Sequence, residues 1–366
     1  MNILIDIGHP AHIHYFRNAI RLWQRHGHRV LITARDKEVT FSLLRAYGLP
    51  YVSRGAGGRG LLGKLLYLLK GDRAIIRAAS GFRPDVLLSF GSPYAAQASQ
   101  WLGKPHIAFD DTEHARLEHA MYLPFTDSVV TPVAFRKNMG NKQIRFQGFI
   151  ELCHLHPAHF QPDPAVLTMV GLTKGEPFIV LRFVSWGASH DVGQQGISQA
   201  QKISLVRDLS RYARIFISSE GPLPGELEPY RLTLPPQHLH DLLACARLYI
   251  GEGSTTATEC ALLGVPNILI SSLLKPATCP GVHLELARYG LQSLFTSFDG
   301  VLARAVALLG EGVPADYQQR RQVMLADTID VTAFMVWLVE QYPDSLRILT
   351  EQPDFMDRFG AVPVSP

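Results

Sequence analysis

The stretch Leu248–Glu259 reads LYIGEGSTTATE and contains the change of pattern that decides the fold. A short apolar run at 248–251, typical of a buried strand, leads into a turn of small residues, and a helical pattern follows at 255–263. Such a turn leaves the first N–H groups of the helix without acceptors, and these groups attract anions. The stretch therefore predicts a parallel α/β unit with a site suited to a diphosphate. The residues expected to contact it are Gly253, Ser254, Thr255 and Thr256.

The same alternation of strands and helices extends through both halves of the chain. Strands are expected at 2–8, 29–34, 85–90, 106–110 and 128–131, and again at 178–184, 214–218, 248–251 and 267–271. Helical segments lie between them, which is typical of βαβ units that build a parallel sheet. Prolines at 157, 162, 164 and 177 interrupt any long element between the two series.

This pattern predicts an α/β protein with two Rossmann-like parallel-sheet domains that face a central cleft. The domains are expected at residues 1–160 and 161–325. One long helix is expected from Asp316 to Tyr342, with its last part at 326–345 counted as a separate segment. The remaining residues, 346–366, carry several prolines and are expected to form a loose tail.

Composition limits the classes of protein to consider. Of 366 residues, 47% are hydrophobic and 18% are charged, which excludes extensive disorder. The 35 Lys and Arg residues against 32 Asp and Glu give a net charge of +3, too balanced for a dedicated nucleic-acid-binding protein. No apolar run approaches the length of a membrane span and the N-terminus lacks a signal-peptide pattern, so a cytoplasmic location is expected. The cysteines form no C-x-x-C pair, and free thiols are expected at Cys153, Cys245, Cys260 and Cys279.

Ligands of open parallel sheets bind at the carboxyl ends of the strands, so the residues after each strand are the candidates for function. The first strand ends in GHPAHIH, which carries His9, His12 and His14. Imidazole can take a proton from a hydroxyl near neutral pH, and His12 is the expected catalytic base, while His9 is a further catalytic candidate. Capping of the next helix, or local packing, is the alternative role for these histidines.

Two adjacent carboxylates, Asp110 and Asp111, follow the strand at 106–110. Because successive strand residues point to opposite faces, one of them can cap the next helix while the other faces a ligand. Asp111 is the second candidate for the base. Ser92, which follows the strand at 85–90, is expected to cap the helix that begins at Pro93.

Arg182 interrupts the otherwise apolar strand at 178–184, so it requires a carboxylate or an anionic ligand as its partner. The following residues, SWGASHD at 185–191, offer hydroxyls, an aromatic ring and an imidazole, which suits a phosphorylated ligand with a sugar or a base. An internal salt bridge of Arg182 is the alternative. The expected contacts in this region are Ser185, Trp186, Ser219 and Glu220 for substrate binding and His190 for proton transfer.

Two further features complete the expectations. Glu259 lies one helical turn beyond the small-residue turn, where its carboxylate can accept hydrogen bonds from ribose hydroxyls; a solvated glutamate is the alternative.

Residues 60–77 mix leucines with Lys64, Lys70, Arg73 and Arg77. They are expected to form a helix packed on the sheet, and peripheral contact with the inner face of a membrane is the alternative.

The motifs at the strand ends resemble those of a known family. Over roughly residues 1–345 the chain is similar to the GT-B superfamily of nucleotide-sugar enzymes, and in particular to an uncharacterised bacterial and archaeal group within it. The resemblance rests on DIGHPAH at 6–12, RFVSWGASHD at 182–191 and GEGSTTATE at 251–259.

The resemblance implies a division of roles between the domains. The C-terminal domain would bind a sugar donor linked to a nucleoside diphosphate, expected to be UDP. The N-terminal domain would hold a glycan or lipid-linked acceptor, and the helix at 326–345 would return to that domain. No metal and no separate cofactor are expected, because backbone N–H groups and Arg182 would stabilise the leaving diphosphate. His283 is also expected to bind substrate.

A glycosyltransferase of glycan or cell-envelope biosynthesis is therefore the expected activity. The alternatives are a non-hydrolysing UDP-N-acetylglucosamine 2-epimerase, with Asp111 and His190 in proton transfer, and a non-catalytic protein that binds sugar nucleotides. The epimerases carry an acidic residue where this chain has Gly91-Ser92-Pro93, which favours the transferase.

Overall fold

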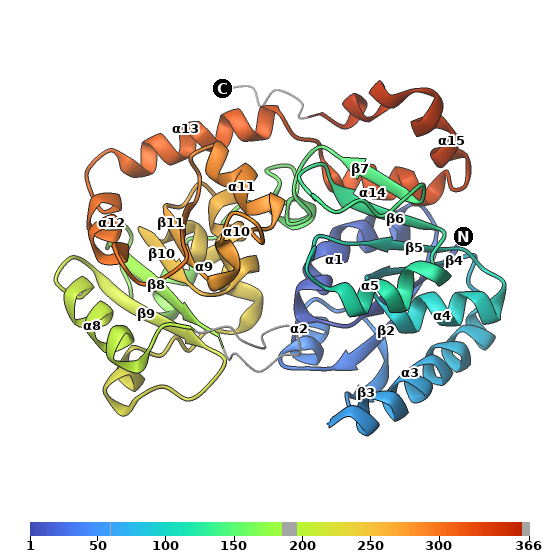
Figure 1. Ribbon diagram of the computed structural model, residues 1–366, viewed down its shortest axis with the longest axis horizontal. Helices are drawn as coiled ribbons and strands as arrows, with labels where there is room; N and C mark the ends of the chain where they lie inside the picture. The colour runs from blue at the N-terminus through green and yellow to red at the C-terminus, as the bar shows by residue number, and fades with distance from the viewer. Residues whose placement is uncertain (59, 185–195, 361–366) are drawn as a thin grey trace. The chain divides into compact units, whose positions relative to one another are not determined.

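The computed structural model describes residues 1–58, 60–184 and 196–360. The chain divides into two compact units (Figure 1). Unit 1 contains Met1–His159 and Asp327–Pro366, and unit 2 contains Phe160–Ala326. The segment that follows residue 326 thus belongs to the same unit as the N-terminal part of the chain.

Unit 1 is built on a seven-stranded parallel sheet in the order β3-β2-β1-β4-β5-β6-β7. The order runs outward in both directions from β1, as in a doubly wound α/β fold. Its central strands are buried and apolar because helices cover both faces of the sheet. The strands are β1 (Asn2–Ile7), β2 (Arg29–Asp36), β3 (Tyr51–Ala56), β4 (Val86–Phe90), β5 (His106–Phe109), β6 (Ser128–Pro132) and β7 (Gln143–Phe146).

The helices of unit 1 pack through apolar faces that the sequence spaces at helical intervals. In α1, His9 caps the N-terminus and Pro10 occupies the first turn, while Ile13, Phe16 and Trp23 are buried. The helices are α1 (Pro10–Arg25), α2 (Thr40–Ala46), α3 (Gly60–Phe82), α4 (Pro93–Leu102), α5 (Arg116–Tyr122), α6 (Leu152–Leu155), α14 (Val331–Glu340) and α15 (Asp344–Glu351), with short 3₁₀ turns η1 (Leu123–Phe125) and η5 (Pro353–Phe359).

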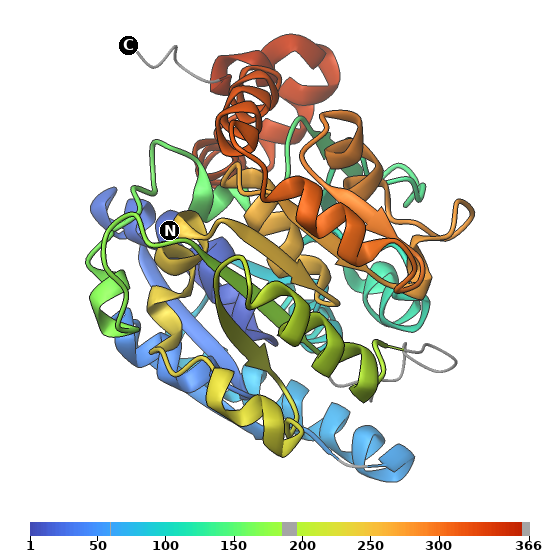
Figure 2. The same cartoon turned by 90° about the vertical axis from the view of Figure 1, so that its left-hand side faces the viewer.

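Unit 2 has a five-stranded parallel sheet in the order β12-β11-β10-β8-β9. The strands are β8 (Phe178–Phe183), β9 (Arg214–Ser219), β10 (Leu248–Gly251), β11 (Asn267–Ile270) and β12 (Ser293–Phe295). The helices are α7 (Val166–Met169), α8 (Gln199–Leu209), α9 (Leu239–Cys245), α10 (Ser254–Leu262), α11 (Gly281–Arg288), α12 (Val301–Leu308) and α13 (Val313–Ala326), with 3₁₀ turns η2 (Gly225–Tyr230), η3 (Pro236–His238) and η4 (Ser272–Leu274). Helix α8 lies beside β8 and β9 in both views (Figure 2).

Two expectations about the C-terminal part are wrong. The single helix from Asp316 to Tyr342 is interrupted, because Asp330 caps a new helix by accepting a hydrogen bond from the N–H of Ala333. The tail is not loose up to residue 360, since α15 and η5 occupy most of it. The N–H of Asp330 donates to the carbonyl of Phe359 over 2.7 Å, which ties the end of η5 to the start of α14.

The basic stretch at 60–77 belongs to α3. In its second half, Ile75 and Ala79 are buried against Leu4 and Leu87 of the sheet, as expected for a packed helix. Lys70, Arg73 and Arg77 are exposed, so contact of this helix with a membrane surface stays a proposal. Across residues 1–58, 60–184 and 196–360, no helix has both the length and the apolar character needed to cross a bilayer.

Candidate functional site

Polar side chains in unit 2 gather where β8, β9 and β10 end side by side. Arg182 lies near the carboxyl end of β8 and pairs in register with Ser218 of β9 and Gly251 of β10. The carboxyl ends of parallel strands form the ligand-binding edge of an open α/β sheet. This edge, with the start of α10, is the candidate anion site of unit 2.

The Arg182 guanidinium is held beside the start of α10. It donates to the Ser218 hydroxyl and to the Glu220 carboxylate, each over 2.8 Å. A Cβ at Gly253 would lie only 3.1 Å from Nε of Arg182, so the glycine allows this close approach. The salt bridge foreseen as the alternative role of Arg182 is therefore present, and 22% of the arginine side chain remains accessible to a ligand.

Ser218 and Ser219 make different contacts at the end of β9. The Ser219 hydroxyl donates to the carbonyl of Gly221 over 3.0 Å, whereas the Ser218 hydroxyl accepts from Arg182. Successive strand residues point to opposite faces, which separates the two side chains. Ser218 thus joins Arg182 at this edge, and the predicted substrate contact of Ser219 stays a prediction.

The N-terminus of α10 has the predicted form. Gly253 is the N-cap and supplies no side-chain hydrogen bond. The first backbone bond of the helix runs from the N–H of Ala257 to the carbonyl of Gly253 over 3.1 Å. The N–H groups of Ser254, Thr255 and Thr256 thus precede the first helical acceptor, as an anion site at a helix N-terminus requires.

Ser254 is the first residue of α10 and is linked to two buried side chains. Its hydroxyl lies 2.6 Å from Nε2 of His283, whose Nδ1 lies 2.9 Å from Oε1 of Gln292. With the glutamine oxygen as acceptor, His283 donates from Nδ1 and its Nε2 accepts the proton of Ser254. His283 is only 1% exposed and contacts the exposed Ser254, and its predicted substrate contact stays a prediction. Gln292 was missed at the sequence level.

The predicted ribose contact, Glu259, lies in the interior of α10. Its side chain is buried, and its Oε1 lies 2.9 Å from Nε2 of His240. Because the side chain is buried, Glu259 is not the solvent-exposed glutamate that was the alternative. Its hydrogen bond to a ribose stays a prediction.

Glu252, next to Gly253, was also missed by sequence reasoning. Its buried carboxylate accepts hydrogen bonds from the N–H groups of Val184 and Ile197, over 3.3 and 2.6 Å. Ser185, Trp186 and His190 lie outside the described residues, so their predicted roles stay predictions.

Unit 1 has its own group of polar residues, at the neighbouring ends of β1, β4 and β5. Nδ1 of His9 accepts from the N–H of Ala11, and Nδ1 of His12 accepts from the N–H of Gly8 over 3.3 Å. Because a backbone N–H can only donate, each neutral ring carries its proton on Nε2. Burial and the neighbouring charges of His9, Lys37 and Arg54 lower the pKa of His12 well below its ordinary value. His12 is therefore a neutral hydrogen-bond donor, which disfavours the predicted role of base.

Asp110 and Asp111 have the separate surroundings that strand alternation predicts. Asp110 is buried, and its carboxylate accepts from Tyr122, from Thr112 and from His119. Asp111 is partly exposed, and the hydroxyl of Thr112 donates to it over 3.0 Å. Burial and the charge of Asp110 raise the pKa of Asp111 to about 7. A carboxylate with such a pKa is suited to general-base catalysis near neutral pH.

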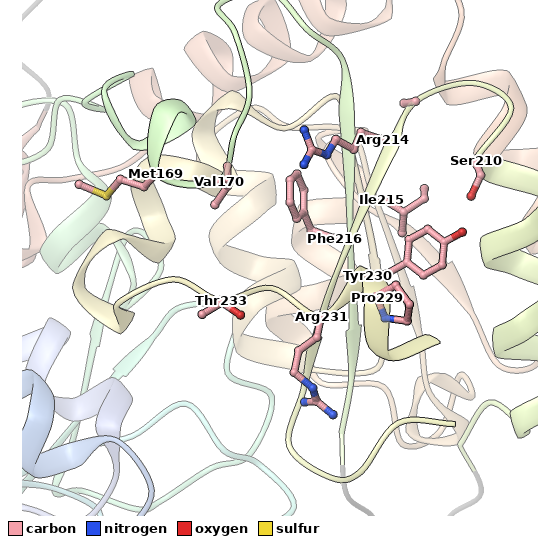
Figure 3. Close-up of a pocket in the computed structure, with 11 residues that line it drawn as sticks. Met169, Val170, Ser210, Arg214, Ile215, Phe216, Pro229, Tyr230, Arg231 and Thr233 are labelled. Atoms are coloured by element: carbon pink, nitrogen blue, oxygen red, sulfur yellow. The ribbon is translucent and has the colours of Figure 1, made fainter. Parts of the chain in front are cut away.

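A separate cavity lies in unit 2 at the amino end of β9 (Figure 3). Its volume is about 510 Å³, and Met169, Arg214, Phe216, Tyr230 and Arg231 are among the residues that line it. The predicted site residues are not among the described residues of its wall, so the cavity plays no part in the site above.

The chain is similar to one known protein in sequence and to several solved structures in fold. The relative named "Uncharacterized protein MJ0665", from Methanocaldococcus jannaschii, is 25% identical over 281 residues, which cover 73% of this chain and 81% of the relative. The solved structure of a putative UDP-N-acetylglucosamine 2-epimerase from Listeria monocytogenes has a TM-score of 0.64 at 11% identity, with 89% of this chain and 95% of that chain covered. The structure of MurG from Acinetobacter baumannii has a TM-score of 0.57 at 15% identity, with 93% and 99% covered.

At these identities the structural likeness establishes the fold. The two parallel-sheet units have the GT-B architecture of glycosyltransferases and UDP-N-acetylglucosamine 2-epimerases, as the resemblance implied. The family model described as "Protein of unknown function (DUF354)" matches residues 1–291. The chain belongs to this family.

Proposed function

We propose that this protein transfers a sugar from a nucleoside-diphosphate sugar, UDP-linked, to a hydroxyl acceptor in glycan or cell-envelope biosynthesis. The observation that carries the proposal is the start of α10, where the N–H groups of residues 254–256 lie beside the Arg182 guanidinium. These donors suit the diphosphate that leaves when the glycosidic bond forms. The GT-B fold is consistent with this chemistry and does not by itself select it.

In the proposed reaction, the acceptor oxygen bonds to the anomeric carbon of the donor while the bond from that carbon to the β-phosphate oxygen breaks. The electron pair of the broken bond goes to the diphosphate, whose developing charge is stabilised by the α10 N–H groups and Arg182. The acceptor proton goes to a base in unit 1.

We assign the base to Asp111 rather than to His12. The Nδ1 lone pair of His12 is used by the N–H of Gly8, whereas Asp111 is partly exposed and has a pKa of about 7. His12 instead offers an Nε2–H donor for an oxygen of the acceptor.

The test is release of nucleoside diphosphate from UDP-, GDP- and dTDP-sugars, measured with and without candidate acceptors such as polyprenyl phosphates and oligosaccharides. The proposal expects release that depends on both a donor and an acceptor and is lost in Arg182→Gln. Release that no acceptor stimulates would contradict transfer.

A 2-epimerase is the second candidate, because a partly exposed carboxylate with a pKa near 7 is equally suited to removing a proton from sugar carbon 2. This reaction needs no acceptor. It predicts incorporation of solvent deuterium at carbon 2 of a UDP-sugar in heavy water, which transfer does not. A non-catalytic binding protein would instead show ligand-induced thermal stabilisation without turnover or deuterium incorporation.

A further inference from the structure

The carboxyl ends of β2 and β3 in unit 1 carry an arginine that the proposed reaction does not use. The guanidinium of Arg35 lies directly against the backbone of Gly57, in the glycine-rich turn after β3, and a Cβ at that position would overlap it. No positive φ is found at Gly57, so close approach of the arginine, rather than backbone conformation, is what a side chain there would disturb.

Within the described part of the chain, the guanidinium of Arg35 has no carboxylate partner. Its Nε atom is buried and makes no hydrogen bond there. The guanidinium lies over the face of the Tyr67 ring, 5.6 Å from the centroid, and its charge also acts on the hydroxyl of Tyr94. A guanidinium without a carboxylate partner is suited to an anionic ligand, which its terminal N–H groups would bind because the Nε atom itself is buried.

The neighbouring Arg54 differs from Arg35 in having a carboxylate partner, although the Nε atoms of both arginines make no hydrogen bond of good geometry. Arg54 is buried, and its Nε lies 2.7 Å from Oδ1 of the buried Asp6. It also donates to Oδ2 of Asp6 over 3.0 Å and to the Tyr67 hydroxyl over 3.3 Å. Asp6 therefore neutralises Arg54, while the charge of Arg35 remains available.

Both basic and acidic groups lie near the same edge of unit 1. Nζ of Lys70 lies 3.9 Å from where a Cβ of Gly55 would be, and Gly55 has a φ of +76°. His12 carries its ring proton on Nε2, and the charges of Lys37 and Arg54 act on its ring. Carboxylates are present too: Asp6 is used by Arg54, and Glu38 pairs with Lys37 over 3.3 Å. Asp72 is half-buried with Oδ1 unpaired, and burial and the charge of Asp6 raise its pKa to about 6, so it is largely ionised at pH 7.

We propose that Arg35 and Lys70, with Gly55 near the end of β3 and Gly57 just after it, form a second anion site, in unit 1, that binds the phosphate group of a ligand. A planar guanidinium held against a glycine backbone presents paired N–H donors to two phosphate oxygens, and the lysine adds a point charge. The site lies wholly within unit 1 and does not depend on the donor proposed for unit 2.

The test is calorimetric titration of inorganic pyrophosphate into protein that is already saturated with UDP, so that the unit 2 site is filled. Wild-type protein is expected to bind pyrophosphate. Arg35→Gln and Gly57→Ala are each expected to weaken this binding about tenfold or more, the scale of a charge-assisted bidentate contact. Arg73→Gln is the control: it removes an exposed arginine from α3, the helix that carries Lys70, and is expected to change the affinity less than about twofold.

Unchanged pyrophosphate affinity in Arg35→Gln would overturn the proposal, as would equal losses in Arg35→Gln and Arg73→Gln. An unchanged circular dichroism spectrum and an unchanged urea denaturation curve in Arg35→Gln and Arg73→Gln show that both units are folded. If UDP does not bind at all, the proposed function fails separately, and the comparison is made without UDP between Arg35→Gln and Arg182→Gln. Loss of binding in Arg35→Gln alone then still supports the unit 1 site.

A second arm identifies the source of the phosphate. Sedimentation is measured with phosphatidylcholine vesicles that contain or lack phosphatidic acid. Association that requires both phosphatidic acid and Arg35 supports a phosphate on a lipid, whereas pyrophosphate binding without vesicle association supports a phosphate on a soluble ligand. Absence of both kinds of binding contradicts the site.

Discussion

The Asp110 carboxylate lies 2.5 Å from the Tyr122 hydroxyl, which donates to its Oδ2 atom. His119 donates to the same oxygen from Nε2, and Lys137 donates to Nδ1 of that histidine. This buried network fixes a negative charge next to Asp111, and with burial it raises the pKa of Asp111 to about 7. The chemistry proposed for unit 1 depends on this pair of carboxylates.

Replacement of the proposed base, Asp111→Asn, is expected to lower the turnover number about 100- to 10,000-fold, the usual contribution of general-base catalysis. In the wild-type enzyme the rate is expected to rise with pH through about 7, because only the ionised carboxylate accepts the proton. Asp110→Asn removes the neighbouring charge and is expected to shift this rise to lower pH. Exposed Glu226→Gln is the control and is expected to leave the profile unchanged. An unchanged pH profile in Asp110→Asn would contradict the coupling.

The same raised pKa predicts a pH-dependent stability. Between the ordinary value of 3.8 and about 7, the folded state holds the Asp111 proton and the unfolded state does not. By linkage, the free energy of unfolding therefore falls as pH rises through this window. Urea denaturation is expected to show Asp111→Asn gaining stability relative to wild type as pH rises from 4 to 7. A pH-independent difference between the two proteins would show that the native pKa is not raised.

Much of the framework was predictable because the pattern that forms it is local. The strands at 85–90 and 248–251 are short apolar runs next to helical patterns, and the structure confirms them as β4 and β10. Strands β3, β7 and β12 were missed. All three carry polar residues and lie at or near sheet edges, where one face and one hydrogen-bonding edge are open and no apolar run is required.

The site was predictable only where its residues are neighbours in sequence. The turn at Gly253 can be recognised in the sequence as a run of small residues between a strand pattern and a helical pattern. By contrast, Ser254 and His283 are 29 residues apart, and Arg182 and Ser218 are 36 apart, so their contacts depend on strand order. The disfavoured base, His12, could not be recognised from sequence, because the N–H of Gly8 that occupies its Nδ1 is a feature of the local backbone path.

A methyl group added at Gly253, at the start of α10, is expected to weaken nucleotide binding although no charged group is lost. In Gly253→Ala the new methyl group would press on Nε of Arg182, 3.1 Å away, and displace the guanidinium. Calorimetry with UDP is expected to show an affinity about tenfold lower in this variant, and similarly in Arg182→Gln. Arg207→Gln, on the exposed side of α8, is the control. If Gly253→Ala and the wild-type protein bind UDP with equal affinity, Arg182 does not contact UDP.

Loss of the Ser254 hydroxyl tests the link from His283 to the ligand. Ser254→Ala removes one hydrogen bond and is expected to lower UDP affinity about fivefold, which corresponds to roughly 1 kcal/mol. Because Ser254 is exposed, the melting temperature is expected to change little. By contrast, His283→Ala leaves a buried cavity and takes the donor away from Oε1 of Gln292. This variant is expected to lower the free energy of unfolding by about 1–3 kcal/mol. A large loss of stability in Ser254→Ala would indicate a structural role instead.

The buried pair Asp6–Arg54 is expected to be a major structural contact of unit 1. Arg54→Met leaves the Asp6 carboxylate buried without its cation and is expected to lower the free energy of unfolding by about 3–5 kcal/mol in urea denaturation. The double variant Asp6→Asn with Arg54→Met is expected to recover part of this loss, because no unpaired charge remains. Exposed Arg77→Met should stay within about 0.5 kcal/mol of wild type.

The central claim is that unit 2 binds a diphosphate at the start of α10, and a crystal structure of the complex with UDP tests it most directly. The account predicts density for the diphosphate within hydrogen-bond distance of the N–H groups of residues 254–256, with the Arg182 guanidinium turned from Glu220 toward a phosphate oxygen. Density for UDP that makes no contact with these N–H groups would contradict the account.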